Sequence, residues 1–318
     1  MDRSDLGTRM KRYEVASRTY LTRRMPVIMR IDGRAFHSFT KGFQRPFDPV
    51  LRAAMKNTML SLCKEIQGCV LGYTQSDEIT LVLVDYQTLT SDAWFDYEVE
   101  KMCSIGASAA TVFFLRSFSD AYDKWFSYAG DCSPAERIMS YERASKKMPM
   151  FDCRVFNVPK EDICNNLLWR QQDATRNSIQ SVGQAFFSHK ELQGKSCKDI
   201  QDMLFKQKEI NWNDYATEYK RGCCCIKNAD GSWVIDEEIP IFSQDRAYIE
   251  SRIYPESTRL DVIRRMPAKE LARMLVSYED ADEPRYHSPG GAICYDEETA
   301  IEDCLEWLEG NDGDIKYS

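Results

Sequence analysis

The chain has 318 residues, of which 43% are hydrophobic and 29% are charged, a composition typical of a globular protein with a substantial core rather than of a disordered chain. It contains no run of about eighteen apolar residues, so we expect no membrane span, and its charged N-terminus lacks the apolar core of a secretory signal, so we expect a cytoplasmic protein. The formal net charge of −8 is uneven, because residues 279–318 hold thirteen Asp or Glu and two basic residues. The rest of the chain therefore carries +3, which is compatible with a polyanionic partner.

Twelve cysteines are spread along the chain without the spacing of a zinc site. No CxxC pair occurs, and Cys223, Cys224 and Cys225 are consecutive, so in a strand their thiols would point to alternate faces. We therefore interpret the cysteines as reduced and mostly buried.

Hydrophobic periodicity divides the first 160 residues into helices and strands. In chain order, the pattern predicts a helix over 1–25, a strand over 26–31, a helix over 48–65, strands over 69–75 and 79–85, a helix over 92–118 and a strand over 151–159. Asp48 and Pro49 suit the cap and the first position of the second helix. The small residues Gly106 and Ala110 would let the third helix approach a sheet closely.

From the first strand onward the order is βαββαβ, the ferredoxin-like arrangement of an α+β protein. In this topology the first strand lies beside the central hairpin, so Asp32, which follows "VIMRI", should meet the "SDE" turn at 76–78. Downstream, we expect helices and then a hairpin around "ADGS" within residues 161–255. Residues 256–318 are interpreted as an appended acidic module or a partly disordered tail.

Asp32, Asp77 and Glu78 form the main cluster of candidate catalytic residues. Carboxylates held close together repel one another unless a cation neutralises them or one of them binds a proton. Such hard oxygen ligands suit Mg²⁺ together with phosphate oxygens. Each acid alone is more typical of a turn or a solvated strand end, whereas their convergence favours a metal site. Gly33, which follows Asp32, leaves the backbone open to a ligand.

Basic residues follow the first strand, in "GRAFH" and "KGFQR": Arg34, His37, Lys41 and Arg45. These side chains suit the oxygens of a triphosphate, and we interpret His37 as a structural or phosphate-facing residue rather than a general base. Nucleotidyl transfer requires acidic side chains that hold metal ions beside basic side chains that bind phosphate. Two metal ions stabilise both the attacking and the leaving oxygen.

The segments that carry this chemistry resemble the tRNA-His guanylyltransferase family of reverse (3′-to-5′) nucleotide polymerases. The resemblance rests on "RIDGRAFHSFTKGFQRPFD" and "GYTQSDEITLVL", and it is extended over residues 1–254 by "FDCRVF", "WRQQDATRNSI", "RGCCCIK" and "EIPIFSQDRAYI". It implies a catalytic polymerase palm over 1–160 and a helical and hairpin region over 161–255 that contacts tRNA, followed by the acidic extension 256–318. It also implies a homotetramer.

The resemblance further implies the site residues. Two Mg²⁺ ions would be held by Asp32, the Gly33 carbonyl and Asp77, with Glu78 beside them. The residues expected to bind ATP, GTP or another nucleoside triphosphate are Arg30, Arg34, Ala35, Phe36, His37, Lys41, Arg45, Ser76 and Lys101. For tRNA we expect contacts from Asn177, Lys206, Lys208 and Arg221, with Arg23, Arg24, Ser178 and Lys220 as further candidates.

In this family, ATP activates the 5′-monophosphate of a tRNA, and the 3′-hydroxyl of an incoming nucleoside triphosphate then attacks the activated phosphate. Eukaryotic members carry His-Ile-Asn-Asn after "WRQ", whereas this chain has Thr175 at the position of the histidine. It thus more closely resembles the guanylyltransferase-like proteins of the family, which repair 5′-truncated tRNAs by template base pairing.

We therefore predict template-dependent 3′-to-5′ addition to tRNA 5′ ends, with addition of G at position −1 of tRNA-His as the alternative. A binding protein without turnover would not need mutually repelling acids, and a nucleotide cyclase would act without RNA.

Overall fold

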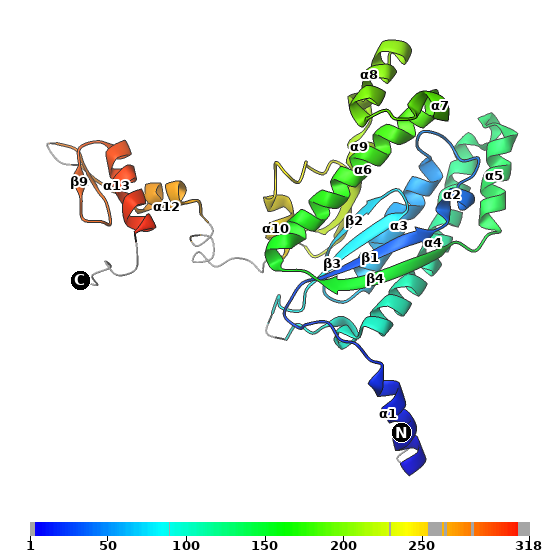
Figure 1. Ribbon diagram of the computed structural model, residues 1–318, viewed down its shortest axis with the longest axis horizontal. Coiled ribbons are helices and arrows are strands. Elements are labelled where there is room, and N and C mark those ends of the chain that lie inside the picture. Colours follow the sequence, from blue (N-terminus) through cyan, green and yellow to red (C-terminus); the bar gives the residue numbers. More distant parts are fainter. Residues whose placement is uncertain are drawn as a thin grey trace. The chain divides into compact units, whose positions relative to one another are not determined.

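The computed structural model is built around one six-stranded antiparallel sheet (Figure 1). The structure describes residues 4–88, 90–228, 230–253, 263, 266–280 and 283–310. The strands of the large sheet lie in the order β4-β1-β3-β2-β5-β6, and their bounds are β1 (Val27–Arg34), β2 (Cys69–Gln75), β3 (Glu78–Leu83), β4 (Met150–Asn157), β5 (Cys223–Lys227) and β6 (Trp233–Asp236). The order of the first four strands confirms the predicted ferredoxin-like fold, and the predicted hairpin adds β5 and β6 at the β2 edge.

Helices surround this sheet, and several lie where the sequence pattern placed them. Their bounds are α1 (Asp5–Ala16), α2 (Phe36–Phe39), α3 (Pro49–Glu65), α4 (Val99–Ala129), α5 (Ala135–Ser145), α6 (Ile163–Phe186), α7 (His189–Leu192), α8 (Cys197–Lys208), α9 (Thr217–Arg221) and α10 (Ala247–Ile253). α3 begins as predicted, since the Asp48 side chain accepts a hydrogen bond from the Leu51 amide at 2.9 Å and Pro49 is the first helical residue.

The two faces of the sheet enter separate cores, because alternate residues of a strand point to opposite sides. α3 and α4 pack on the face that carries Met29 and Leu81, and α6 and α10 pack on the face that carries Ile28 and Val82. The consecutive cysteines follow the predicted alternation, with Cys223 and Cys225 in the first core and Cys224 in the second. Most of the cysteines are buried or half-buried, and Cys132 is exposed.

α4 begins later than predicted. We expected a helix from residue 92, but Trp94–Tyr97 form a 3₁₀ turn in which Phe95 and Asp96 have φ values of 51° and 55°. An α-helix of L-residues does not run through such left-handed conformations. The regular helix therefore starts at Val99 and continues to Ala129.

α4 is long and apolar enough to cross a membrane, by length and composition alone, although the absence of a continuous apolar run had led us to expect no such helix. One face of α4, with Met102, Gly106 and Phe114, is buried in the core of the sheet. A Cβ atom at Gly106 would lie 3.1 Å from the Cys153 sulfur, so the glycine permits the close approach that the sequence predicted. This packing accounts for the apolar face of the helix.

The N-terminal helix is shorter than predicted, because it ends at Ala16 rather than near residue 25. After it the chain runs in an extended form beside the start of α4, where the Leu21 amide donates a hydrogen bond to the Tyr97 carbonyl. The Arg23 guanidinium pairs with three acids, Asp85, Asp92 and Asp96. The Arg24 amide donates to the Asp85 carboxylate, and the Arg24 guanidinium donates to the Asp85 carbonyl. A contact of these two arginines with tRNA stays a prediction, and for Arg23 it would compete with the three acids.

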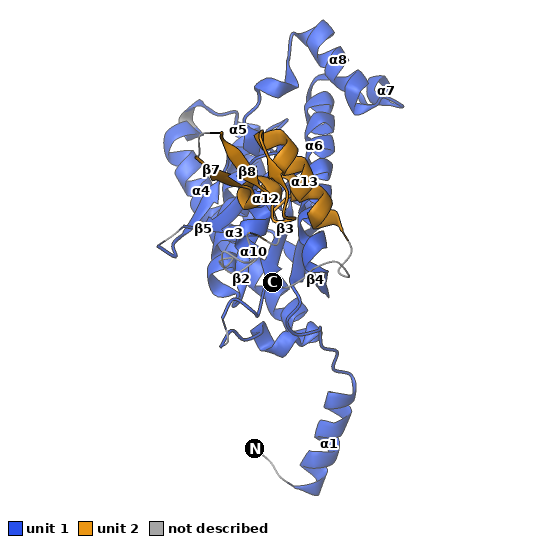
Figure 2. Ribbon diagram, turned by 90° about the vertical axis from the view of Figure 1, so that its left-hand side faces the viewer, with its two compact units in different colours: residues 1–255 blue, residues 256–318 orange. Residues whose placement is uncertain are grey.

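The chain divides into two compact units, residues 1–255 and 256–318 (Figure 2). The described part of the second unit contains α12 (Ala268–Leu275), the strands β7 (Ser277–Glu279), β8 (Arg285–His287) and β9 (Ile293–Cys294), and α13 (Glu297–Glu309). Its small core includes Ala272, Ile301 and Cys304. Of the two readings of this segment, the described residues match an appended module. Residues 311–318 lie outside the description.

Candidate active site

The two carboxylates among the three predicted metal ligands lie at the same end of the sheet. Asp32 stands near the end of β1, and Asp77 occupies the turn between β2 and β3. The Gly33 amide donates a hydrogen bond to the Asp77 carbonyl at 3.0 Å, and Asp32 is the direct partner of Glu78 in the β1–β3 ladder. The structure thus brings together the acids that the topology predicted to meet.

Burial raises the pKa of both Asp32 and Asp77 above the usual value of an aspartate. For Asp77 the Asp32 carboxylate raises the pKa further, while the Ser76 hydroxyl, 3.0 Å from Asp77 Oδ1, acts in the opposite direction. For Asp32, the Arg30 guanidinium partly offsets the effect of burial on the pKa. Two carboxylates that repel each other in a partly dry environment are a favourable place for a cation.

The chemistry of these donors fits magnesium. Asp32 and Asp77 offer hard carboxylate oxygens, and Mg²⁺ commonly uses one or two carboxylates together with waters and phosphate oxygens. Among the described residues, no three His, Cys, Asp or Glu side chains converge in a geometry that could hold a metal. Any further ligands would therefore be backbone carbonyls, phosphate oxygens or water.

Gly33 is explained by packing. A Cβ atom at this position would lie 2.4 Å from the Phe36 ring, which cannot be accommodated without a shift of the ring. The Phe36 ring itself lies 5.2 Å from Phe39, 5.3 Å from Phe114 and 5.1 Å from Phe151, measured between ring centroids. We had predicted that the glycine opens the backbone to a ligand, and the structure adds a steric reason for it.

Glu78 is held by two arginines. Arg170 Nε and Nη2 donate to its two carboxylate oxygens at 2.7 and 2.9 Å, and Arg30 Nη2 lies 2.7 Å from Oε2. Both Glu78 and Arg170 are buried, with exposed fractions of 3% and 4%. We predicted Glu78 beside the metals and Arg30 against a nucleotide, and both stay predictions. Within this chain the two side chains form an ion-pair cluster with Arg170 that joins β1 and β3 to α6.

Sequence reasoning missed Arg170 as a member of this cluster. The available signal was its position in α6, because an arginine among buried residues such as Leu167 and Ala174 requires a buried acid. It also missed Asp152 and Arg154 of β4. Asp152 is the ladder partner of Asp32 on the other side of β1, and Arg154 pairs with Asp152 at 3.1 Å.

A cavity of about 590 Å³ opens beside Asp77. Its lining includes Gly33, Asp77 and six of the predicted nucleotide-binding residues: Ala35, Phe36, His37, Lys41, Arg45 and Ser76. Within the described ranges, the side chains of His37, Lys41 and Arg45 make no hydrogen bond or ion pair to the protein. Their donors are therefore free for an anionic ligand. Arg34 is exposed and lies outside this lining.

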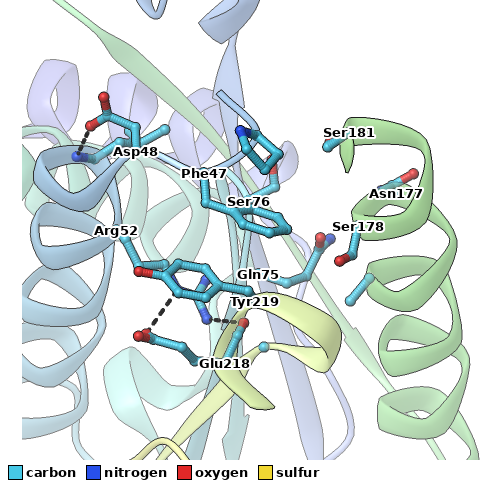
Figure 3. A pocket seen from close by; sticks show the side chains of 14 residues that line it. Phe47, Asp48, Arg52, Gln75, Ser76, Asn177, Ser178, Ser181, Glu218 and Tyr219 are labelled. Carbon is cyan, nitrogen blue, oxygen red and sulfur yellow. Dashed lines mark hydrogen bonds and ion pairs between the residues drawn. The ribbon is translucent and has the colours of Figure 1, made fainter. Parts of the chain in front are cut away.

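A smaller cavity of about 140 Å³ adjoins the first, and Asp48 and Ser76 line both. Figure 3 shows Phe47 and Tyr219, whose rings are stacked with centroids 4.6 Å apart, on the side opposite α6. Asn177 of α6 lines this cavity from the other side (Figure 3).

Ser178, which we expected to contact tRNA with Asn177, lines the same cavity, and its buried hydroxyl accepts a hydrogen bond from the Trp212 indole at 3.0 Å. Its hydroxyl therefore helps to hold Trp212 against α6.

The remaining predicted residues are not among those that line these two cavities, although Arg221 lies between Tyr219 and Gly222, which line the smaller one. Lys101 is in the first turn of α4, which covers the sheet face opposite to that of Asp32, and it pairs with Glu98 at 3.3 Å. Lys206 and Lys208 are exposed in the last turn of α8, and Arg221 ends α9. The roles of these four residues stay predictions.

Comparisons with known proteins show which family the chain is similar to. Residues 7–159 match the family model described as tRNAHis guanylyltransferase. The probable tRNA(His) guanylyltransferase of Dictyostelium discoideum is 28% identical over 214 residues, which cover 63% of this chain and 75% of that protein.

Two solved structures are similar over most of this chain. A bacterial tRNA(His) guanylyltransferase (Thg1)-like protein in complex with ATP is 42% identical, with a TM-score of 0.68, and the match covers 79% of this chain and 100% of that one. A bacterial Thg1-like protein in complex with GTP has the same coverage, 36% identity and a TM-score of 0.61. This chain therefore belongs to the tRNA(His) guanylyltransferase family and is a nucleotidyltransferase.

Proposed function

We propose that this protein adds nucleotides to the 5′ end of tRNA in the 3′-to-5′ direction and so repairs truncated 5′ ends. The observation that carries the proposal is the Asp32–Asp77 pair beside a cavity whose His37, Lys41 and Arg45 side chains have no protein partner in the described residues. The ATP and GTP complexes of the bacterial relatives support a nucleoside triphosphate as the occupant of this cavity.

The residues of this chain then have distinct roles. Two Mg²⁺ ions held by Asp32, Asp77 and the Gly33 carbonyl would neutralise the charge that develops on the attacking and leaving oxygens. Lys41 and Arg45 bind triphosphate oxygens and fix the nucleotide relative to the acids. Glu78, held by Arg170, keeps the β3 end of the turn in place.

The reaction proceeds by two phosphoryl transfers. An oxygen of the tRNA 5′-monophosphate attacks the α-phosphorus of ATP, a new P–O bond forms, and pyrophosphate leaves. The 3′-hydroxyl of an incoming nucleoside triphosphate then attacks the activated 5′ phosphorus, loses its proton, and AMP leaves. The new end carries a triphosphate, from which pyrophosphate is later removed. Both transfers depend on alignment and charge neutralisation rather than on a covalent enzyme intermediate.

Thr175 supports repair over the alternative, addition of G at position −1 of tRNA-His. The family members expected to recognise tRNA-His have histidine at this position, and threonine lacks an aromatic ring and a titratable nitrogen. Nucleotide choice would then come from base pairing with the opposite strand of the acceptor stem.

The decisive experiment uses 5′-monophosphorylated tRNAs of several identities that lack their first nucleotide, with ATP and each nucleoside triphosphate in turn. We expect addition of the nucleotide that pairs with the template, whichever tRNA is used. Addition restricted to G on tRNA-His would favour the alternative, and ATP turnover without RNA would overturn both.

From the family resemblance we also propose a homotetramer. Sedimentation velocity at micromolar concentration measures this directly, and a monomer that is fully active would contradict it.

A further inference from the structure

A further polar cavity, which we call the second cavity, adjoins the larger cavity beside Asp77 on the side of α7 and α8. Its volume is about 530 Å³, and it shares Arg45 and Gln184 with the larger cavity beside Asp77. The C-terminal half of α6 provides one wall, and the segment through α7 to the start of α8 provides the other. In Figure 1 these helices lie together at the end of α6. The site described above uses none of the residues particular to this second cavity.

The lining combines free polar side chains with an apolar base. Six polar side chains line it, of which three are basic or imidazole groups and three are amides: Arg45, His189, Lys195, Gln180, Gln184 and Gln193. In the part of the chain that the structure describes, none of the six forms a hydrogen bond or an ion pair with the protein. Phe187 and Ile200 are buried, with exposed fractions of 8% and 4%, and supply the apolar surface. The lining includes no Asp or Glu.

These groups select the chemistry of a nucleotide. Arg45 and Lys195 suit phosphate oxygens. Glutamine side chains offer a donor and an acceptor together, which is the pattern of a base edge. An apolar and aromatic surface suits the face of a base. A single phosphodiester requires no metal, whereas a free nucleoside triphosphate is bound with Mg²⁺, for which this acid-free cavity offers no carboxylate.

We propose that this second cavity binds one unpaired nucleotide of the RNA substrate, with Arg45 placed between that nucleotide and the one in the larger cavity. The inference rests on the proposed function and extends it, because it assigns an RNA subsite to α6–α8. The unpaired nucleotide could come from the 5′ strand or from the single-stranded 3′ end, and the experiment separates these two sources.

The binding test uses the double variant Gln193→Ala/Lys195→Ala, which alters only the second cavity. Its matched control is Gln207→Ala/Lys198→Ala, which removes an exposed glutamine and an exposed lysine of α8 that do not line the cavity. We expect the cavity variant to bind a fluorescent 5′-monophosphorylated acceptor-stem hairpin about tenfold more weakly. Its affinity for ATP should stay unchanged, and the control should bind both ligands like the wild type.

Salt dependence gives a second readout. The logarithm of RNA affinity falls as the logarithm of salt concentration rises. Loss of the Lys195 contact should make this slope less steep by about 0.7. An unchanged RNA affinity and slope, or an equal loss in the control, would overturn the inference. A parallel loss of ATP binding would also overturn the inference, because the substitutions would then disturb the larger cavity as well as the second one. If equilibrium dialysis finds a second ATP per chain that the cavity variant lacks, the subsite takes free nucleotide instead.

Photocrosslinking identifies the source of the nucleotide in the wild-type protein and needs no variant. A hairpin carries 4-thiouridine either at the unpaired 5′ position or in the 3′ overhang, and the crosslinked peptides are sequenced. Crosslinks to residues 180–195 from one arm would support the inference and name the strand, whereas crosslinks only elsewhere in both arms would overturn it. Failure of the wild type to bind or extend any RNA would instead refute the proposed function, so the two failures are distinct.

Discussion

At Asp32 and Asp77 the chain places two carboxyl groups close together where burial raises the pKa of both. Such an arrangement costs stability in the free protein and is retained where binding uses it. Glu78 differs from this pair, because Arg170 and Arg30 neutralise it within the chain. The three acids that look alike in the sequence therefore separate into a pair without a basic partner within hydrogen-bond distance among the described residues, which we propose binds the cation, and a structural anchor.

The first prediction tests the pair. Asp32→Asn and Asp77→Asn should each lower nucleotide addition by at least about a hundredfold, because the charge that holds the cation is lost. In magnesium-free buffer the melting temperature should stay the same or rise, since a repulsive buried charge has been removed. Initial-rate assays and calorimetry measure the two effects, with Asp120→Asn on the exposed face of α4 as the control. Near-wild-type turnover in either site variant would contradict the metal role.

The second prediction concerns the anchor. Arg170→Ala should lower the free energy of unfolding by about 3 kcal/mol, because it leaves the buried Glu78 with Arg30 as its remaining partner. The control is Arg176→Ala on the same helix, which breaks only an exposed pair with Asp173 and should cost less than about 1 kcal/mol. Urea unfolding compares the two. Adding Glu78→Gln to Arg170→Ala should recover part of the loss, and a purely additive double variant would argue against the anchor.

At the scale of elements, the segment 44–48 links the cavities to the start of α3. The buried Asp48 carboxylate accepts hydrogen bonds from the amides of Gln44 and Leu51 and from the Tyr141 hydroxyl, at 2.8, 2.9 and 2.7 Å. The sequence identified Asp48 only as a helix cap. In the structure the same side chain also fixes the loop that lines the larger cavity beside Asp77.

This double role gives the third prediction. Asp48→Ala should destabilise the fold by about 1–2 kcal/mol through loss of the cap, and it should also weaken ATP binding because the 44–48 loop is released. Asp48→Asn keeps an acceptor for the Leu51 amide and should lose much less stability and much less ATP affinity. Chemical denaturation and calorimetric titration with ATP measure the two quantities. A stable Asp48→Ala variant with unchanged ATP affinity would show that the loop is held by other contacts.

Elements whose evidence is local could be predicted, and those that depend on distant partners could not. The order of β1, β2 and β3 followed from apolar runs and turn residues, so the meeting of Asp32 and Asp77 was foreseen. The Glu78–Arg170 pair joins residues 92 positions apart, and nothing near Glu78 in the sequence indicates it. Lys101 looked suitable for a nucleotide, but its position depends on which face of the sheet α4 covers, which periodicity alone does not fix.

At the scale of the whole molecule, charge is divided between the two compact units. The second unit holds sixteen Asp or Glu and seven Lys or Arg, which makes it net −9, so the first unit is net +1. Within the described residues, α13 and its cap Asp296 contribute only acidic charges. A polyanionic substrate is therefore repelled by the second unit wherever the charge of that unit acts within a Debye length.

Removal of the second unit tests this balance. A chain that ends at Pro255 keeps every residue that lines the three cavities, so nucleotide addition should persist. Its affinity for tRNA should equal or exceed that of the full chain at low salt, and the difference should shrink above about 0.2 M salt, where surface charges are screened. Fluorescence anisotropy across a salt series, with rates measured on the same preparations, makes the comparison. A collapse of activity in a truncated protein that still melts cooperatively would mean that the acidic unit takes part in catalysis or in RNA binding.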